Sequence, residues 1–137
     1  MIGWLPVQRL STPRSIIAWA YQLVLAAMFL AAAVAKLAGA PIWVQIFDQI
    51  GLGQWFRIVT GVVEIVGAVA LLVPGFAAFG ALWLGTTMVF AILMHLIVLH
   101  TSPVPAALLL VLNLVVVWIR YGQLAALHAR FLFDHRA

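Results

Sequence analysis

The chain has 137 residues, of which 67% are hydrophobic and 7% charged, with seven Lys and Arg against three Asp and Glu. A soluble domain carries roughly 25% charged residues because its surface faces water. This composition therefore excludes a soluble domain and predicts that lipid surrounds most of the protein. The absence of cysteine excludes a disulfide, a Cys-x-x-Cys redox pair and a thiolate metal site within the chain.

Four apolar runs predict four membrane spans, because about 20 apolar residues cross the hydrocarbon once. The runs cover about residues 15–37, 55–73, 77–99 and 105–121. The first run exceeds the roughly 7–15 apolar residues of a signal peptide, so we expect it to stay in the protein. Pro74-Gly75 predicts a tight turn between the second and third spans, and the segment 101–105 breaks the chain before the fourth.

A shorter amphipathic segment, residues 39–54, lies between the first two spans. Ile42, Ile46 and Ile50 recur there at helical spacing beside Trp43, which is typical of a short helix in the headgroup layer. The segment 122–137 is expected to form a cytoplasmic tail with a surface helix. We therefore predict an all-α fold: one membrane domain over residues 1–137, built as a four-helix bundle with an interfacial helix between spans 1 and 2.

The basic residues predict the orientation of the chain. Lys36 and Arg57 lie on one side of the expected membrane, and five arginines lie on the side shared by the termini: Arg9, Arg14, Arg120, Arg130 and Arg136. The positive-inside rule places both termini in the cytoplasm, for a multi-pass protein of the plasma (inner) membrane. Basic residues at membrane edges also explain the net charge of +4 without a nucleic-acid partner.

Ionisable side chains within a span cost several kcal/mol, so they are expected to face the bundle interior and to find partners. Glu64 lies near the middle of the second span, on the same face as Arg57 and Thr60. Gly61 and Gly67 follow the same stripe, where small residues allow neighbouring helices to approach closely. Glu64 is therefore predicted to point inward.

The other spans carry polar side chains on single faces. These are Gln22 and Lys36 in the first span, Thr87 and His95 in the third, and Asn113 in the fourth. With a rise of about 1.5 Å per residue, Arg57, His95 and Glu64 descend in that order from the outer surface, and Lys36 lies near the top of the series. We expect one polar cluster in the outer half of the bundle.

Two interpretations of this cluster remain open. In the structural one, Arg57 or Lys36 neutralises Glu64, while His95 and Asn113 form interhelical hydrogen bonds. In the functional one, Glu64 and His95 exchange protons in a ligand site that opens to the outer side, and Arg57 or Lys36 holds an anionic or carbonyl group. Gln22, Thr60, Thr87 and Asn113 would then give the site polar support within the membrane.

A metal site is not expected in this chain. His95 and His100 are five residues apart and do not share a helical face, so they could join Glu64 around a metal only by a coincidence of packing.

Several segments together resemble the DoxX-like family of small four-helix membrane proteins, over about residues 20–120. They are Phe29 to Leu37, Gly61 to Gly67, Leu71 to Gly75, and Ala91 to His95. Carried over by position, the polar residues of the family fall on Lys36, Glu64 and His95. The sequence departs from the family pattern in having Ala32 or Ala35 where a glycine often precedes the lysine, and in lacking a thiol.

The resemblance implies a role beside a redox enzyme. The family was named for a membrane subunit associated with thiosulfate:quinone oxidoreduction; other members are linked to membrane oxidoreductase complexes in oxidative-stress defence, and eukaryotic relatives act as assembly or cargo factors. We therefore expect a membrane subunit of a quinone-linked complex, with a quinone as non-covalent cofactor and other subunits or a second copy as partners. The sequence contains no visible haem, flavin or iron–sulfur ligand set, which favours no catalytic activity by the chain alone.

Two alternatives remain for the function. One is a non-enzymatic scaffold or assembly subunit whose polar cluster holds the bundle together. The other is a small transporter, for which four helices are few and no inverted repeat is visible.

Overall fold

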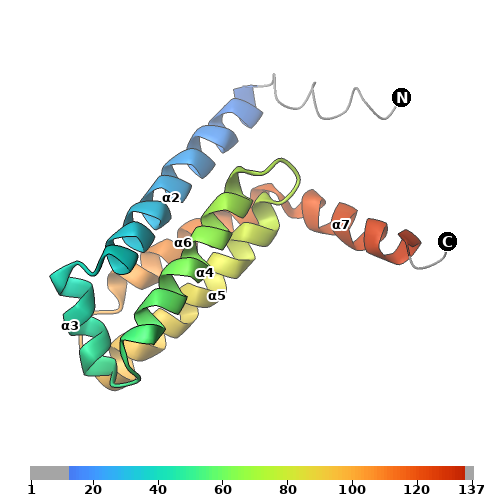
Figure 1. Ribbon diagram of the computed structural model, residues 1–137. Coiled ribbons are helices and arrows are strands. Elements are labelled where there is room, and N and C mark those ends of the chain that lie inside the picture. The colour runs from blue at the N-terminus through green and yellow to red at the C-terminus, as the bar shows by residue number, and fades with distance from the viewer. Residues whose placement is uncertain (1–12, 135–137) are drawn as a thin grey trace.

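The computed structural model describes residues 13–134, and within this range it is helical with no strand (Figure 1). The elements in chain order are α2 (Pro13–Ala38), α3 (Pro41–Ile50), α4 (Gln54–Leu72), α5 (Ala77–Met94), the π-helix η1 (His95–Leu99), α6 (Val104–Ile119) and α7 (Tyr121–Asp134).

Three helical stretches are each long and apolar enough to cross a membrane: Ser15–Ala38, Gln54–Leu72 and Ala77–Leu99. α6 lies close to the fourth expected span, 105–121, but with 16 residues and an end at Ile119 it is not long enough to count as a span by itself. At about 1.5 Å per residue α6 is roughly 24 Å long, short of the roughly 30 Å of hydrocarbon. It reaches the length of a span only together with α7, which continues after a bend of 62°.

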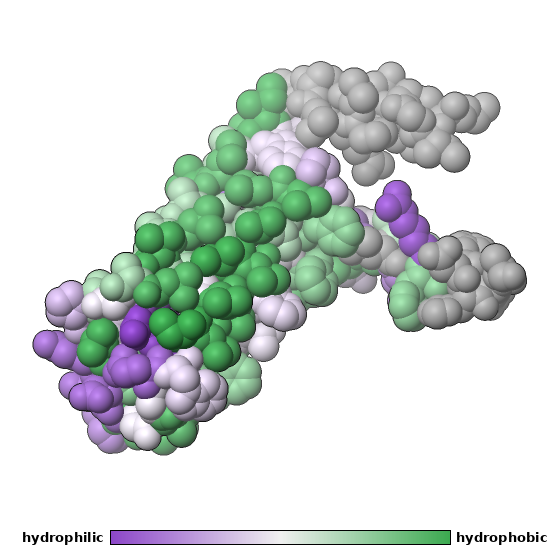
Figure 2. Space-filling model, in the orientation of Figure 1, coloured by the Kyte–Doolittle hydropathy of each residue, from purple (hydrophilic) through white to green (hydrophobic). Residues whose placement is uncertain are grey.

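The long helices α2, α4, α5 and α6 lie alongside one another, and two shorter helices mark the ends of the bundle (Figure 1). α3 lies across one end, near the loop 100–103; we call this the α3 end. The start of α2, the turn at 73–76 and the start of α7 lie at the opposite, α7 end. Figure 2 shows an apolar surface over the middle of the helices and hydrophilic residues at the α3 end. Arg9 and Arg136, which contributed to the predicted orientation, lie outside the described residues.

The breaks predicted at Pro74-Gly75 and at 101–105 are both present, between α4 and α5 and between η1 and α6. The turn between α4 and α5 contains Gly75 at φ 90°. α3 ends at Ile50 and is followed by Gly51, whose left-handed backbone (φ 81°) suits glycine. The π-helix η1 was not predicted; it ends at Leu99, and the next residue, His100, has φ 51° and donates its backbone N–H to the carbonyl of His95.

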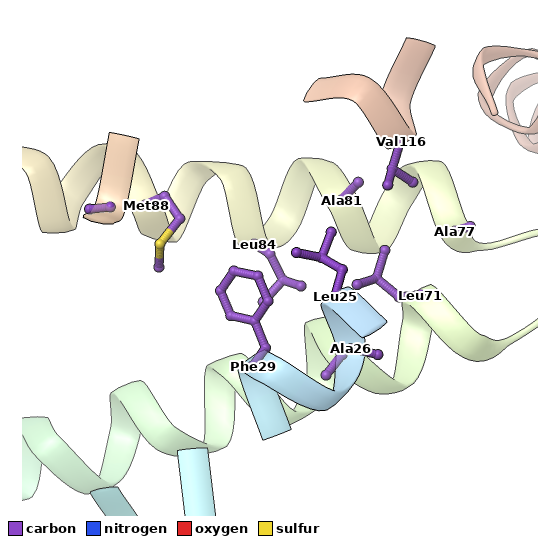
Figure 3. Close-up of a cluster of buried hydrophobic side chains, with 11 residues drawn as sticks. Leu25, Ala26, Phe29, Leu71, Ala77, Ala81, Leu84, Met88 and Val116 are labelled. Atoms are coloured by element: carbon purple, nitrogen blue, oxygen red, sulfur yellow. The ribbon is translucent and has the colours of Figure 1, made fainter. Parts of the chain in front are cut away.

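The core lies toward the α7 end, where α4 and α5 pack most closely. A Cβ added at Gly80 would lie 2.7 Å from the backbone nitrogen of Leu71 and 2.8 Å from the carbonyl oxygen of Gly67, so only hydrogen fits between the two helices. Figure 3 shows the apolar side chains that converge beside this contact: Leu25 and Phe29 of α2, Leu71 of α4, and Leu84 of α5. This contact holds the α7 ends of the helices together.

Candidate functional site

The centre of the site is an ion pair between α2 and α4. Lys36 is 5% exposed and Glu64 is 1% exposed, and Lys36 Nζ donates a hydrogen bond to Glu64 Oε1. The same ammonium lies 4.2 Å from the centroid of the Trp43 ring of α3, a cation–π distance. Lys36 is thus the residue that neutralises Glu64, one of the two that the structural interpretation offered.

Glu64 keeps one carboxylate oxygen without a partner. Oε2 is buried, and no group in residues 13–134 donates a hydrogen bond to it. A buried charged oxygen without a donor is costly, and most such groups in proteins find a protein or water partner. The second oxygen of Glu64 is therefore available to a group that this part of the chain does not supply.

A cavity of about 570 Å³ adjoins the pair. Its walls come from all the long helices, from α3 and from η1, and they are mostly apolar. The polar side chains among them are Lys36, Thr60, Glu64, Thr86, Thr87 and His95. This volume lies within the range of about 300–1,000 Å³ typical of small-molecule sites, which combine apolar walls with a few polar groups.

His95 lies at the junction of α5 and η1, half-buried on the cavity wall. Its Nδ1 is 2.7 Å from Thr101 Oγ1, and its carbonyl accepts a hydrogen bond from the Thr101 backbone N–H at 3.0 Å. Among the described residues, no hydrogen bond or ion pair joins His95 to Glu64. Proton exchange between the two side chains would therefore need a molecule in the cavity to connect them.

Thr60 and Thr87 lie on the wall with their hydroxyls turned to their own helices. Thr60 Oγ1 donates to the carbonyl of Phe56 at 2.7 Å, and Thr87 Oγ1 donates to that of Trp83 at 3.1 Å. This bond one turn back is common for threonine in helices. Since the only hydroxyl proton is used, each oxygen can act toward the cavity only as an acceptor.

Arg57 supports the site from outside the cavity: it does not line the cavity, and it forms no ion pair with Glu64. Its Nη1 donates to the carbonyl oxygen of Lys36, and its Nε donates to Gln54 Oε1 at 2.8 Å. Gln54 in turn donates to the carbonyl of Val44 at 3.1 Å. Arg57 therefore ties the C-terminal turn of α2, where carbonyls lack helical partners, to α3 and α4.

Gln22 and Asn113 lie away from the cavity, so they do not give the site the polar support that was expected of them. Gln22 Nε2 donates to the carbonyl of Leu71 at 2.9 Å, and Gln22 Oε1 accepts from Arg120 Nε at 2.7 Å. Gln22 thus connects α2 to α4 and to the end of α6. Asn113 Nδ2 donates to the carbonyl of Leu109 at 2.8 Å, a bond within α6 rather than the interhelical bond of the structural interpretation.

Two tryptophans take part in the site. Trp43 covers Lys36, and Trp83 Nε1 donates to the carbonyl of Val63 at 2.8 Å, which joins α5 to α4. The sequence indicated Trp43 as one of three aromatic residues able to cap an apolar ligand, whereas Trp83 was assigned to the aromatic belt or to the lipid face, where tryptophan is common. The spacing of Trp43, seven residues after Lys36, was a weak signal, because it depends on how sharply the chain turns at Gly39.

No group of three or more His, Cys, Asp or Glu side chains in residues 13–134 is arranged to hold a metal ion. No curated protein and no solved structure gives a match to the chain. The sequence model of the DoxX-like family matches residues 20–119, a range that includes Lys36, Glu64 and His95. The chain therefore belongs to the DoxX-like family.

Proposed function

We propose that this protein is the membrane subunit of a quinone-linked redox complex and that its cavity binds the quinone. The observation that carries the proposal is the buried Oε2 of Glu64, which has no hydrogen-bond partner among the described residues, in a residue that lines an apolar cavity within the spans. The Lys36–Glu64 ion pair uses only Oε1, so it does not account for Oε2. A ligand that donates a hydrogen bond to Oε2, or exchanges a proton with it, would supply the missing partner.

The residues on the wall fit a quinone head. The apolar walls suit its ring, while Lys36 and His95 offer donors for its oxygens. A bound quinone would supply reversible two-electron, two-proton redox chemistry. Lys36 would hold an oxygen of the head, Glu64 would hold a proton at Oε2, and Trp43 would keep water from the ammonium. The electrons would pass to or from a partner subunit, because the chain offers no visible ligand set for a redox centre.

The proposal is tested by purification in mild detergent, followed by native mass spectrometry and extraction of bound quinones. The wild-type protein should carry about one quinone per chain, and Glu64→Gln should lower quinone affinity by about tenfold, the effect of losing roughly 1.4 kcal/mol. Asp48→Asn is the matched control, because Asp48 is an exposed carboxylate outside the cavity. A purified protein that carries no quinone, together with unchanged quinone-dependent activity in Glu64→Gln, would contradict the proposal.

A second candidate is a scaffold or assembly subunit without a ligand. It is favoured by the ion pair between α2 and α4, since removing one member of a buried pair often destabilises a protein. In that case Glu64→Gln would reduce the recovery of partner subunits, and any activity lost would follow the amount of folded protein.

A further inference from the structure

The helices α4 and α5 are held together toward the α7 end. They are in close contact at Gly67 and Gly80, and the hydrogen bond from Trp83 to the carbonyl of Val63 joins them farther along. From this hydrogen bond toward the α3 end, both helices contribute walls of the cavity, among them Val59 on α4. The cavity therefore extends along these halves of α4 and α5.

This space opens toward lipid. Four side chains of α4 and α5 line the cavity and are also exposed on the outside of the bundle: Val59, Trp83, Thr86 and Phe90. Phe90 is 61% exposed and Val59 is 44% exposed. Because they belong to the membrane-crossing stretches, the solvent that they meet is the hydrocarbon. We call these four residues the α4/α5 rim.

The end of the cavity that faces water is covered by α3, which lies across the bundle (Figure 1). Phe47 of α3 is 5% exposed, and its ring is 5.7 Å from that of Phe56 on α4. Trp43 covers Lys36 beside it, and the Arg57–Gln54 hydrogen bonds fasten the loop. A ligand that arrived from water would have to displace this helix, whereas a ligand dissolved in lipid would only have to pass the rim.

We propose that the cavity takes its ligand from the bilayer, through the α4/α5 rim, and that this ligand is a lipid-soluble molecule with a polar head and a long apolar tail. The head lies against the Lys36–Glu64 pair, and the tail leaves between Val59 and Phe90. The proposal rests on the proposed function for the identity of the head and adds to it the class of ligand and the route. Another gap, where Met28 of α2 and Pro105 of α6 line the cavity and are exposed, has fewer exposed wall residues.

The experiment compares two probes on the purified full-length protein in nanodiscs: a benzoquinone with a long isoprenoid tail and the same head without a tail. Binding is measured by native mass spectrometry and by equilibrium partition. Val59→Trp and Thr86→Phe narrow the α4/α5 rim from its two sides. Val62→Trp is the matched control, because Val62 is 49% exposed on α4 but does not line the cavity.

The tailed probe is expected to bind wild-type protein at least about tenfold more tightly than the tailless probe. Val59→Trp and Thr86→Phe should each weaken the tailed probe by about tenfold or more, while Val62→Trp leaves it unchanged. Equal binding of the two probes, or no loss in either rim variant, would overturn the route. If the rim variants bind normally while Glu64→Gln does not, the route alone is wrong; if wild-type protein binds neither probe, the proposed function is wrong as well.

Discussion

At the scale of single residues, the position of Glu64 was predictable but its partner was not. Its spacing from Gly61 and Gly67 placed it on the stripe of small residues, and burial of all three confirms that α4 turns this stripe inward. The choice between Arg57 and Lys36 depended on the turn after α2, which brings the Arg57 guanidinium to the Lys36 carbonyl rather than to a carboxylate. Side-chain patterns along one helix carry no information about that turn.

The Lys36–Glu64 pair should show strong coupling between its members. Lys36→Met leaves a buried carboxylate without its cation, and Glu64→Leu leaves a buried ammonium, so each single variant should lose stability. The double variant, with two apolar side chains of similar size, should lose less than the sum of the singles, by about 0.5–3 kcal/mol. Thermal unfolding in one detergent measures all four proteins. Additive losses would mean that the two side chains do not stabilise each other.

At the scale of elements, the apolar runs predicted where the chain is helical more reliably than how each helix ends. Spans two and three and the short helix after span one occur close to their expected positions. The run 77–99 did not indicate the change from α5 to η1, because both stretches are mostly apolar. Over only five residues, the side-chain pattern of a π-helix cannot be told from that of an α-helix. The break between α6 and α7 lies within about two residues of the predicted boundary between the fourth span and the tail helix, although no proline or glycine stands at Arg120 or Tyr121.

The close approach of α4 and α5 predicts different effects of alanine at two glycines of α5, Gly80 and Gly85. Gly80→Ala would place its Cβ within 2.8 Å of backbone atoms of α4, so the helices must move apart, at a cost of about 1–3 kcal/mol. At Gly85 the nearest atom to an added Cβ is 3.6 Å away, an ordinary contact, and Gly85→Ala should be neutral or stabilise the helix by roughly 0.5–1 kcal/mol. Thermal unfolding of both variants in the same detergent tests the difference. Equal melting temperatures would contradict the tight contact at Gly80.

At the scale of the whole molecule, the position of each polar residue along its helix was predictable. Which helices are neighbours in the bundle was not. The sequence placed Lys36, Glu64 and His95 in one outer cluster with Arg57. Gln22 and Asn113 were expected to give that cluster polar support. Packing instead joins Gln22 to Arg120 toward the α7 end and leaves Lys36, Glu64 and His95 on the cavity at the α3 end. The division arises because neighbouring helices run in opposite directions, so that the start of α2 meets the end of α6. The spacing of polar residues along the chain does not show which helices pack against each other.

The arrangement of the ends leads to a test of orientation in the membrane. The bundle places α3 at one end and the turn 73–76 and the start of α7 at the other (Figure 1), and the positive-inside rule assigns the α7 end to the cytoplasm. Because the chain contains no cysteine, single cysteines can be introduced without background labelling. Gln49 on α3, Pro74 in the turn and Ala126 on α7 are all exposed.

Gln49→Cys should therefore react with a membrane-impermeant maleimide on intact cells, whereas Pro74→Cys and Ala126→Cys should react only after the membrane is permeabilised. Full labelling of each variant in detergent controls for the reactivity of the thiol itself. The reverse pattern would mean that the orientation is opposite to the predicted one, with the Lys36–Glu64 pair and the α3 end toward the cytoplasm. Labelling of Pro74→Cys and Ala126→Cys from opposite sides would mean that the two residues lie on different sides of the membrane. The bend between α6 and α7 would then differ from the one described here.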